Sequence, residues 1–151
     1  MRVTAAASTT LGCAVLILAG CANDAPTVET TLVFDGDRHT ITTTDVTCSR
    51  DGDVLIIFVD GPGKQMVRAV VLDRGRLRAD RVAVRYDELA GFTSDRADVD
   101  VTRSDDTYQL RGRMPPNAGE TAAHSFEIVT TCPEYRPYVP PPGSPPRVPI
   151  E

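Results

Sequence analysis

The stretch Val54-Leu55-Ile56-Ile57-Phe58-Val59 decides the fold class of this chain. Its six apolar side chains follow one another without a break, most of them are β-branched or aromatic, and the turn residues Gly61-Pro62-Gly63 come directly after. A short apolar run that is bounded by turn signals is typical of a buried β-strand. We therefore expect a central strand here, covered on both of its faces.

The sequence on either side of this strand has a hydrophobic pattern of period two, which also favours strands. Turn pairs such as Asp35-Gly36 and Asp51-Gly52 separate the apolar runs at short intervals. About eight short strands of this kind predict an all-β domain, either an antiparallel β-sandwich or a strongly curved sheet. At most one short helix is expected, with residues 65–72 as its place. The other expected strands are residues 31–34, 39–43, 46–48, 66–72, 77–86, 97–103, 108–114 and 124–132.

Two of the four cysteines lie in the N-terminal segment, and Cys48 and Cys132 remain in the body. In the last expected strand Cys132 has the same parity as the apolar Phe126, so both side chains point to the interior. Cys48 shares a face with Val46 in the same way. In an exported, oxidising compartment we expect the two thiols to form one disulfide, which ties an early strand to the last one.

The N-terminal residues 1–20 have the composition of an export signal. They carry Arg2, then a short apolar run, and end at Leu18-Ala19-Gly20-Cys21. The apolar run is about half of the roughly 20 residues that a bilayer-spanning helix needs, so we expect it to be removed. The four closing residues have the pattern of a bacterial lipobox, which makes Cys21 the lipidated first residue of the mature chain. An ordinary secretory signal or an uncleaved anchor is the alternative.

The mature chain is expected to have three parts: a lipidated tether over 21–30, a β domain over 31–133, and a proline-rich tail over 134–151. Pro133 and the residues after it hold eight of the twelve prolines in the chain. Such a composition favours an extended or disordered segment without a core. A spacer or a cell-wall contact is a better interpretation of the tail than a peptide docking motif.

The charge of the chain excludes nucleic acid as a partner. The formal net charge is −5, and removal of Arg2 with the signal would make it −6, so no basic excess exists to neutralise phosphates. The densest basic stretch contains Arg74, Arg76 and Arg78, with aspartates interleaved. One interpretation is a solvated ribbon. The other is a polar contact for acidic glycans or lipid headgroups of the cell envelope.

No motif for catalysis, phosphate binding or calcium binding occurs in the sequence. His39 and His124 are far apart, and neither forms a close ligand pair with a cysteine, so we expect no metal and no cofactor. The sequence thus favours a non-catalytic protein. A carrier for an apolar ligand is the second hypothesis and needs a cavity of roughly 300 Å³ or more. An enzyme, the third, needs a pocket that brings one of the histidines near Ser, Asp or Glu.

Six stretches of the sequence form a recognisable set: Leu18-Ala19-Gly20-Cys21, Val33-Phe34-Asp35-Gly36, Val46-Thr47-Cys48, Ala69-Val70-Val71-Leu72, Tyr108-Gln109-Leu110-Arg111-Gly112 and Ser125-Phe126-Glu127-Ile128-Val129-Thr130-Thr131-Cys132. Together they resemble the mycobacterial 19 kDa lipoprotein antigen family, over residues 32–132 of the body. The resemblance implies a membrane-anchored, surface-exposed lipoprotein of the envelope, recognised by host Toll-like receptor 2 through acylated Cys21, with no established enzymatic activity. The short tether, which leaves little room for glycans, and the long tail depart from the family pattern.

Overall fold

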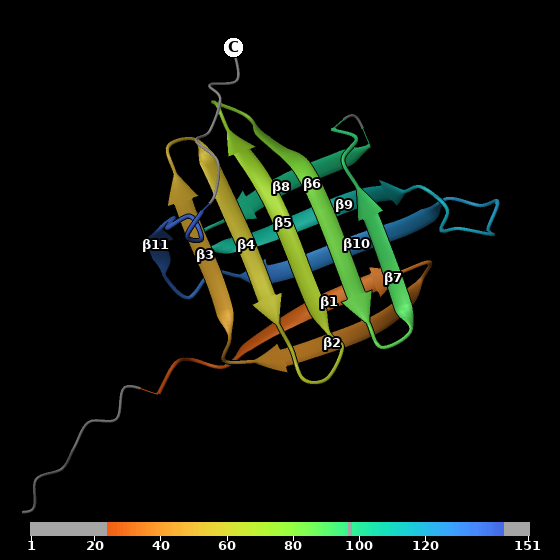
Figure 1. Cartoon of the computed structure of the whole chain (residues 1–151), viewed down its shortest axis with the longest axis horizontal. Helices are drawn as coiled ribbons and strands as arrows, with labels where there is room; N and C mark the ends of the chain where they lie inside the picture. The colour runs from red at the N-terminus through yellow and green to blue at the C-terminus, as the bar shows by residue number, and fades with distance from the viewer. Residues whose placement is uncertain (1–23, 97, 144–151) are drawn as a thin grey trace, which may run out of the picture.

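The computed structural model describes residues 24–96 and 98–143, and in this part of the chain every regular element is a β-strand (Figure 1). The all-β prediction is therefore confirmed. The predicted signal peptide and Cys21 lie outside the described residues. The eleven strands are β1 (Val28–Phe34), β2 (Asp37–Thr43), β3 (Val46–Asp51), β4 (Val54–Asp60), β5 (Met66–Asp73), β6 (Leu77–Tyr86), β7 (Leu89–Thr93), β8 (Val99–Ser104), β9 (Thr107–Met114), β10 (His124–Thr131) and β11 (Tyr135–Pro137).

The strands form two sheets that pack face to face as a sandwich. Sheet A has the order β2-β1-β10-β9-β8, and sheet B has the order β11-β3-β4-β5-β6-β7. Neighbouring strands are antiparallel except for β11, which runs parallel to β3. Figure 1 shows the strands of the two layers crossing at a steep angle. The predicted hairpin turn at Asp35-Gly36 joins β1 to β2, with positive φ at both residues, as this tight turn requires.

The stretch 54–59 forms most of β4, which lies inside sheet B as predicted. The expectation that both of its faces are covered is wrong. Leu55, Ile57 and Val59 are buried against sheet A, whereas the alternate residues Val54 and Ile56 are only half-buried. The sandwich has two layers, so each sheet presents its other face to solvent, and a continuous apolar run does not by itself require a third layer.

The helix considered for 65–72 is absent, because Met66–Asp73 is strand β5, paired on both sides with β4 and β6. Val67, Ala69 and Val71 alternate into the core with an exposed fraction of zero. This spacing is that of a strand, since a helix would place Ala69 on the side opposite Val67 and Val71.

The sequence analysis missed β7, because Ala90-Gly91 has the composition of a turn. The glycine is required by packing: a Cβ atom at Gly91 would lie 2.5 Å from Sδ of Met114 and 3.0 Å from Phe34. Sheet B therefore lies close to sheet A at a residue without a Cβ atom. The same approach could not be predicted from local sequence, since both contacting residues are distant along the chain.

The predicted disulfide is confirmed and joins the two sheets. Cys48 lies in β3 of sheet B, Cys132 follows β10 of sheet A, and their Cα atoms are 5.8 Å apart. Both residues are 1% exposed. The parity argument was sound, because Phe126, Ile128 and Cys132 are all buried on the same face.

Regular structure extends beyond both ends of the predicted 31–133 domain, since β1 begins at Val28 and β11 covers Tyr135–Pro137. Side-chain contacts hold β11 in place. The hydroxyl of Tyr135 donates to Oδ1 of Asp106 at 2.9 Å and lies 3.1 Å from the hydroxyl of Tyr108. The guanidinium of Arg50 stacks 4.5 Å from the centre of the Tyr135 ring. Burial raises the pKa of the Tyr135 hydroxyl far above its usual range, so it stays a donor.

One hydrogen bond in the core joins two side chains that have no access to water. The hydroxyls of Thr30 in β1 and Thr130 in β10 lie 2.7 Å apart, and the two residues are 0% and 1% exposed. The pair therefore satisfies both hydroxyls inside an otherwise apolar interior. On the opposite face of β10, Thr131 bonds Thr107 at 2.8 Å in a half-buried position that water can reach.

We expect Thr30→Val to lower the free energy of unfolding by about 1–3 kcal/mol, because it leaves the Thr130 hydroxyl buried without a partner. The double change Thr30→Val with Thr130→Val should cost less than the two single changes added together, since methyl groups then fill the same space. Urea unfolding measures all three variants. Thr131→Val is the matched control and should cost less than Thr30→Val, because water can replace its lost partner. Strict additivity of the two buried changes would contradict this account.

Candidate functional site

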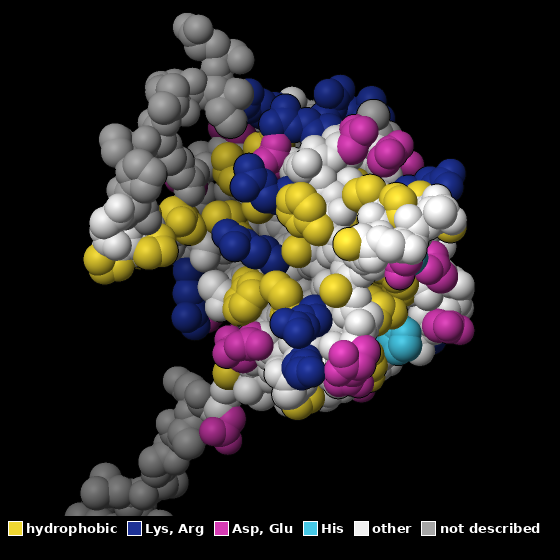
Figure 2. Space-filling model, turned by 45° about the vertical axis from the view of Figure 1, so that its right-hand side comes forward, with side chains coloured by type: hydrophobic (Ala, Val, Ile, Leu, Met, Phe, Trp, Pro, Cys, Tyr) yellow, Lys and Arg dark blue, Asp and Glu magenta, His cyan; other side chains and the backbone are white. Residues whose placement is uncertain are grey.

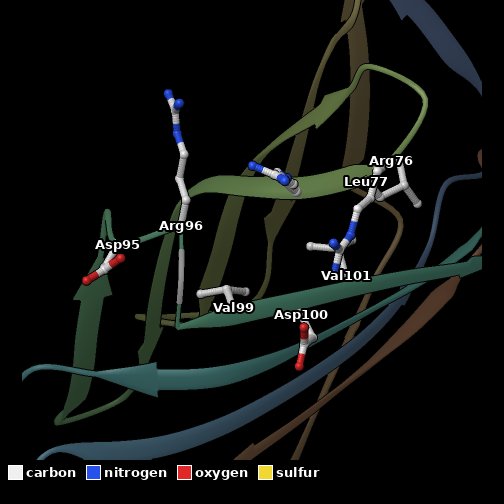
Figure 3. Close-up of a pocket in the computed structure, with 8 residues that line it drawn as sticks. Arg76, Leu77, Asp95, Arg96, Val99, Asp100 and Val101 are labelled. Atoms are coloured by element: carbon white, nitrogen blue, oxygen red, sulfur yellow. The ribbon is translucent and has the colours of Figure 1, made fainter.

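A hollow of about 510 Å³ opens between β6 and β8, where the edge of sheet A meets sheet B. Three segments contribute its lining: the start of β6 with the turn before it, the loop between β7 and β8, and β8 itself. Figure 3 shows these side chains from both strands around the opening. The lining residues are Arg76, Leu77, Arg78, Asp95, Arg96, Val99, Asp100 and Val101. We call this feature the arginine cavity.

The floor of the arginine cavity is apolar because the two strands turn their inward faces to it. Val99 is 7% exposed, and Leu77 and Val101 are half-buried. Val99 and Val101 alternate with Asp100, which Figure 3 shows on the other side of β8, pointing away from β6. Alternation along β8 thus turns Val99 and Val101 toward the cavity and Asp100 to the opposite face of the strand.

Arginines dominate the charge around the opening. Within the described part of the chain, neither Arg76 nor Arg78 forms an ion pair. Figure 3 shows Arg76 reaching from the turn before β6 toward Val101 of β8. Figure 2 shows dark blue side chains gathered along the upper edge of the molecule, the edge at which Figure 1 draws the turn between β5 and β6.

Arg96 is held in place by a carboxylate. Its Nε donates to Oδ1 of Asp80 at 2.9 Å, its terminal nitrogen donates to the same oxygen, and Arg81 contacts the other oxygen at 3.2 Å. Partial burial raises the pKa of the Asp80 carboxyl, but the hydrogen bonds and charges of Arg96 and Arg81 outweigh burial, and the pKa lies below its usual value. This ion-pair cluster joins the loop between β7 and β8 to strand β6.

Two of the three arginines proposed from the sequence, Arg76 and Arg78, lie at the cavity. Arg74 does not line it, because its Nε donates to Oδ2 of Asp53 at 2.8 Å across two neighbouring turns. Sequence reasoning missed Arg96. Arg96 follows the basic stretch by almost twenty residues. Its ion pair with Asp80 of β6 holds it beside the cavity.

A second polar cluster surrounds His124 at the start of β10. Its Nδ1 lies 2.7 Å from Oδ2 of Asp35, and its Nε2 lies 2.5 Å from Oε2 of Glu120. The ring also stacks on Phe34, with centroids 4.9 Å apart. Two nitrogens that both face carboxylates must both carry hydrogen, so the imidazole is held as a cation. We call this arrangement the histidine clamp.

The histidine clamp shifts the pKa of each of its members. The hydrogen bonds that His124 donates to Asp35 and Glu120 raise the pKa of His124, and the bond to Asp35 lowers the pKa of that carboxyl. A hydrogen bond from the backbone N–H of Asn117 is the largest cause that lowers the pKa of Glu120, and the hydrogen bond from His124 is the second. The clamp joins the β1–β2 turn to the β9–β10 loop. Both ring nitrogens are occupied, so His124 has no free nitrogen to activate a nucleophile.

The other candidate residues form no assembled chemical site in the residues that the structure covers. His39 lies in β2 with its ring 4.5 Å from that of Tyr86, and its Nε2 is buried without a hydrogen-bond partner. Residues 24–96 and 98–143 contain no group of three His, Cys, Asp or Glu side chains with the geometry of a metal site. A search of the same residues finds no helix long and apolar enough to cross a membrane.

These features define a small β-sandwich with one inter-sheet disulfide, whose polar groups gather at the rims of the two sheets. The chain belongs to the Mycobacterium 19 kDa lipoprotein antigen family, whose sequence pattern matches residues 23–132. The resemblance seen in the sequence is thereby confirmed. Membership implies an exported protein of the cell envelope. No curated protein matches the chain.

The histidine clamp predicts a stability maximum at mildly acidic pH. Because folding raises the pKa of His124, this residue stabilises the folded state fully below its ordinary pKa of 6.5, and the stabilisation is lost as the pH rises through the higher folded value. Because folding lowers the pKa values of Asp35 and Glu120, these residues stabilise the folded state fully above their ordinary pKa values, 3.8 and 4.5, and that stabilisation is lost as the pH falls. All three groups are therefore charged between about pH 5 and pH 6.5.

We expect the melting temperature of the parent protein to fall between about pH 6 and pH 8.5. The melting temperature of His124→Gln should fall less over the same interval. Differential scanning calorimetry at both values measures the difference. His39→Gln is the matched control, because His39 lacks carboxylate partners, and it should follow the parent protein. Equal pH dependence of the His124 variant and the parent would rule out the clamp as its source.

Proposed function

We propose that the protein is a lipoprotein anchored to the cell-envelope membrane through acylated Cys21, and that it displays a non-catalytic β domain on the outer side. The observation that carries this proposal is the sequence Leu18-Ala19-Gly20-Cys21 at the end of an export signal, together with membership of a lipoprotein antigen family. Two or more acyl chains on one residue suffice for stable attachment to a bilayer.

The length of the tether supports a domain held close to the membrane. Val28, where β1 begins, is seven positions after Cys21, and seven fully extended residues span at most about 25 Å. Val28 pairs with Thr43 of β2, and the Thr43 hydroxyl donates to the carbonyl of Asp60 at 2.7 Å. The end of the sandwich formed by the start of β1, the end of β2 and the end of β4 is therefore the end beside the anchor.

A non-catalytic role fits the chemistry of the described residues. The one histidine that lies among carboxylates uses both ring nitrogens in the clamp. The interior is occupied by side chains such as Leu32, Ile57 and Leu110, each with an exposed fraction of zero. This filling gives no support to the second hypothesis, a carrier with an apolar ligand between its sheets.

Mass spectrometry of the protein purified from its own membrane tests the anchor. We expect a mature chain that begins at Cys21 and carries two or three acyl groups, with residues 1–20 removed. The variant Cys21→Ser is the control and should retain its signal sequence and lack acyl mass. A mature chain with an unmodified cysteine, or one that begins elsewhere, would overturn the proposal.

The acylated N-terminus is also proposed to be the part that host Toll-like receptor 2 recognises. We expect the parent protein to activate a receptor reporter cell line and Cys21→Ser to lose at least nine-tenths of the signal, by an order-of-magnitude estimate for loss of the main anchor chains. Replacement of Cys48 and Cys132 by alanine, which leaves acylation intact, should keep the signal. Activity that depends on the folded domain and not on Cys21 would contradict this role.

A further inference from the structure

We propose that the arginine cavity binds an acidic saccharide, that is, a sugar unit with a single phosphate or carboxylate group, which approaches from the side of the domain that faces away from the anchoring membrane. The cavity itself belongs to the folded body and does not depend on acylation. Only the direction of approach rests on the proposed function.

The position of the cavity follows from the strand register. The end of β4, which lies beside the start of β1, pairs with the start of β5 through Asp60 and Met66. Strand β5 then runs eight residues, or about 26 Å, before the turn that leads to Arg76. The arginine cavity and the start of β1 therefore lie at opposite ends of sheet B, and Figure 1 shows residues 24–27 at the lower left, away from the β5–β6 turn at the top.

The guanidinium groups at the cavity provide the anion site. Arg76 and Arg78 line it from one side and form no ion pair within the described residues. A guanidinium donates two parallel hydrogen bonds to a carboxylate or phosphate, and the planar fork suits either group. Arg96 adds positive charge at the rim, although its own bonds go to Asp80.

The remaining lining indicates what the anion is attached to. Leu77 and Val101 form a small apolar floor on which the C–H face of a sugar ring can pack. Asp100 lies on the other face of β8, close enough for its charge to repel a second anion. A sugar ring with a single negative group satisfies this combination, whereas a surface dense in anions would meet the nearby aspartates and the net negative charge of the chain.

The volume of the cavity sets the size of the ligand. A hollow of about 510 Å³ lies within the roughly 300–1,000 Å³ of ordinary small-molecule sites. It accommodates one or two sugar units and leaves the rest of a longer glycan in solvent. The ligand can therefore be a free sugar acid, a sugar phosphate or the acidic end of a larger glycan, all of which present the same chemistry.

The test is an NMR titration of the full mature chain in detergent micelles with glucuronic acid, glucose 1-phosphate and, as the neutral counterpart, glucose. We expect saturable binding of at least one acidic sugar and none of glucose. In the double variant Arg76→Gln, Arg78→Gln the dissociation constant should rise at least about tenfold, since two charge-assisted contacts are lost.

The matched control is the double variant Arg68→Gln, Arg85→Gln. These arginines lie exposed on β5 and β6, toward the other end of the sheet and outside the cavity lining, and their loss changes the net charge by the same amount. The control should bind as the parent does. Failure of both acidic sugars to bind, or an equal loss in the two double variants, would overturn the proposal.

A last arm separates a saccharide from a membrane surface. The mature chain, residues 21–151, is made with Cys21→Ser, so that it has neither the apolar signal segment nor an acylation site, and is sedimented with vesicles of phosphatidylglycerol or of phosphatidylcholine. We expect it to bind neither. Binding to phosphatidylglycerol vesicles that requires Arg76 and Arg78, without binding of the acidic sugars, would replace the saccharide by a lipid headgroup. Because none of these measurements needs an acyl chain, a failure here differs from a failure of the proposed anchor.

Discussion

The covalent bond between Cys48 and Cys132 is the constraint on which the arrangement of the two sheets depends. Strand β10 lies inside sheet A between β1 and β9, β3 lies inside sheet B, and the disulfide fixes where the two layers cross. The bond closes a loop of 84 residues, for which a chain-entropy treatment gives about 4–5 kcal/mol. The stabilisation by the disulfide matters in a chain with 5% aromatic residues and no tryptophan, since its core consists mainly of small aliphatic side chains.

The bond also explains why the chain continues as strand after its last cysteine. Cys132 brings the backbone next to β3, so the following residues reach the edge of sheet B with little further loss of conformational freedom, and Tyr135 then closes the contact through Asp106 and Tyr108. Proline composition alone predicted a tail from residue 134, because composition does not register a partner that a distant cysteine places nearby. β7 was missed for the same reason, since Gly91 is explained only by Met114 and Phe34.

What could be predicted from the sequence depended on local periodicity. Alternation along 124–132 predicted that strand and the inward direction of Cys132, parity with Val46 predicted that of Cys48, and Asp35-Gly36 predicted a hairpin turn; each was confirmed. The candidate cavity could be predicted only in part, because Arg76 and Arg78 are neighbours in the sequence, while Val99 and Val101 come from the other sheet and Arg96 from the loop that leads to it. Likewise, nothing near His124 in the sequence indicated that Asp35 would become its partner from 89 residues away. Contacts between segments distant in sequence are decided by sheet order, which period-two patterning does not specify.

The four edge strands of the two sheets affect how the domain behaves among densely packed exported proteins. A sheet edge with unpaired backbone groups invites pairing with a neighbour, and crowding raises the rate of such encounters. Here one edge strand, β11, is three residues long and ends in Pro137, another, β7, has five residues, and the two edges of sheet A carry charged side chains such as Arg38 and Asp100. Each of these devices discourages edge-to-edge association. The edges of the domain therefore disfavour sheet extension from one copy to the next, even where many copies lie close together.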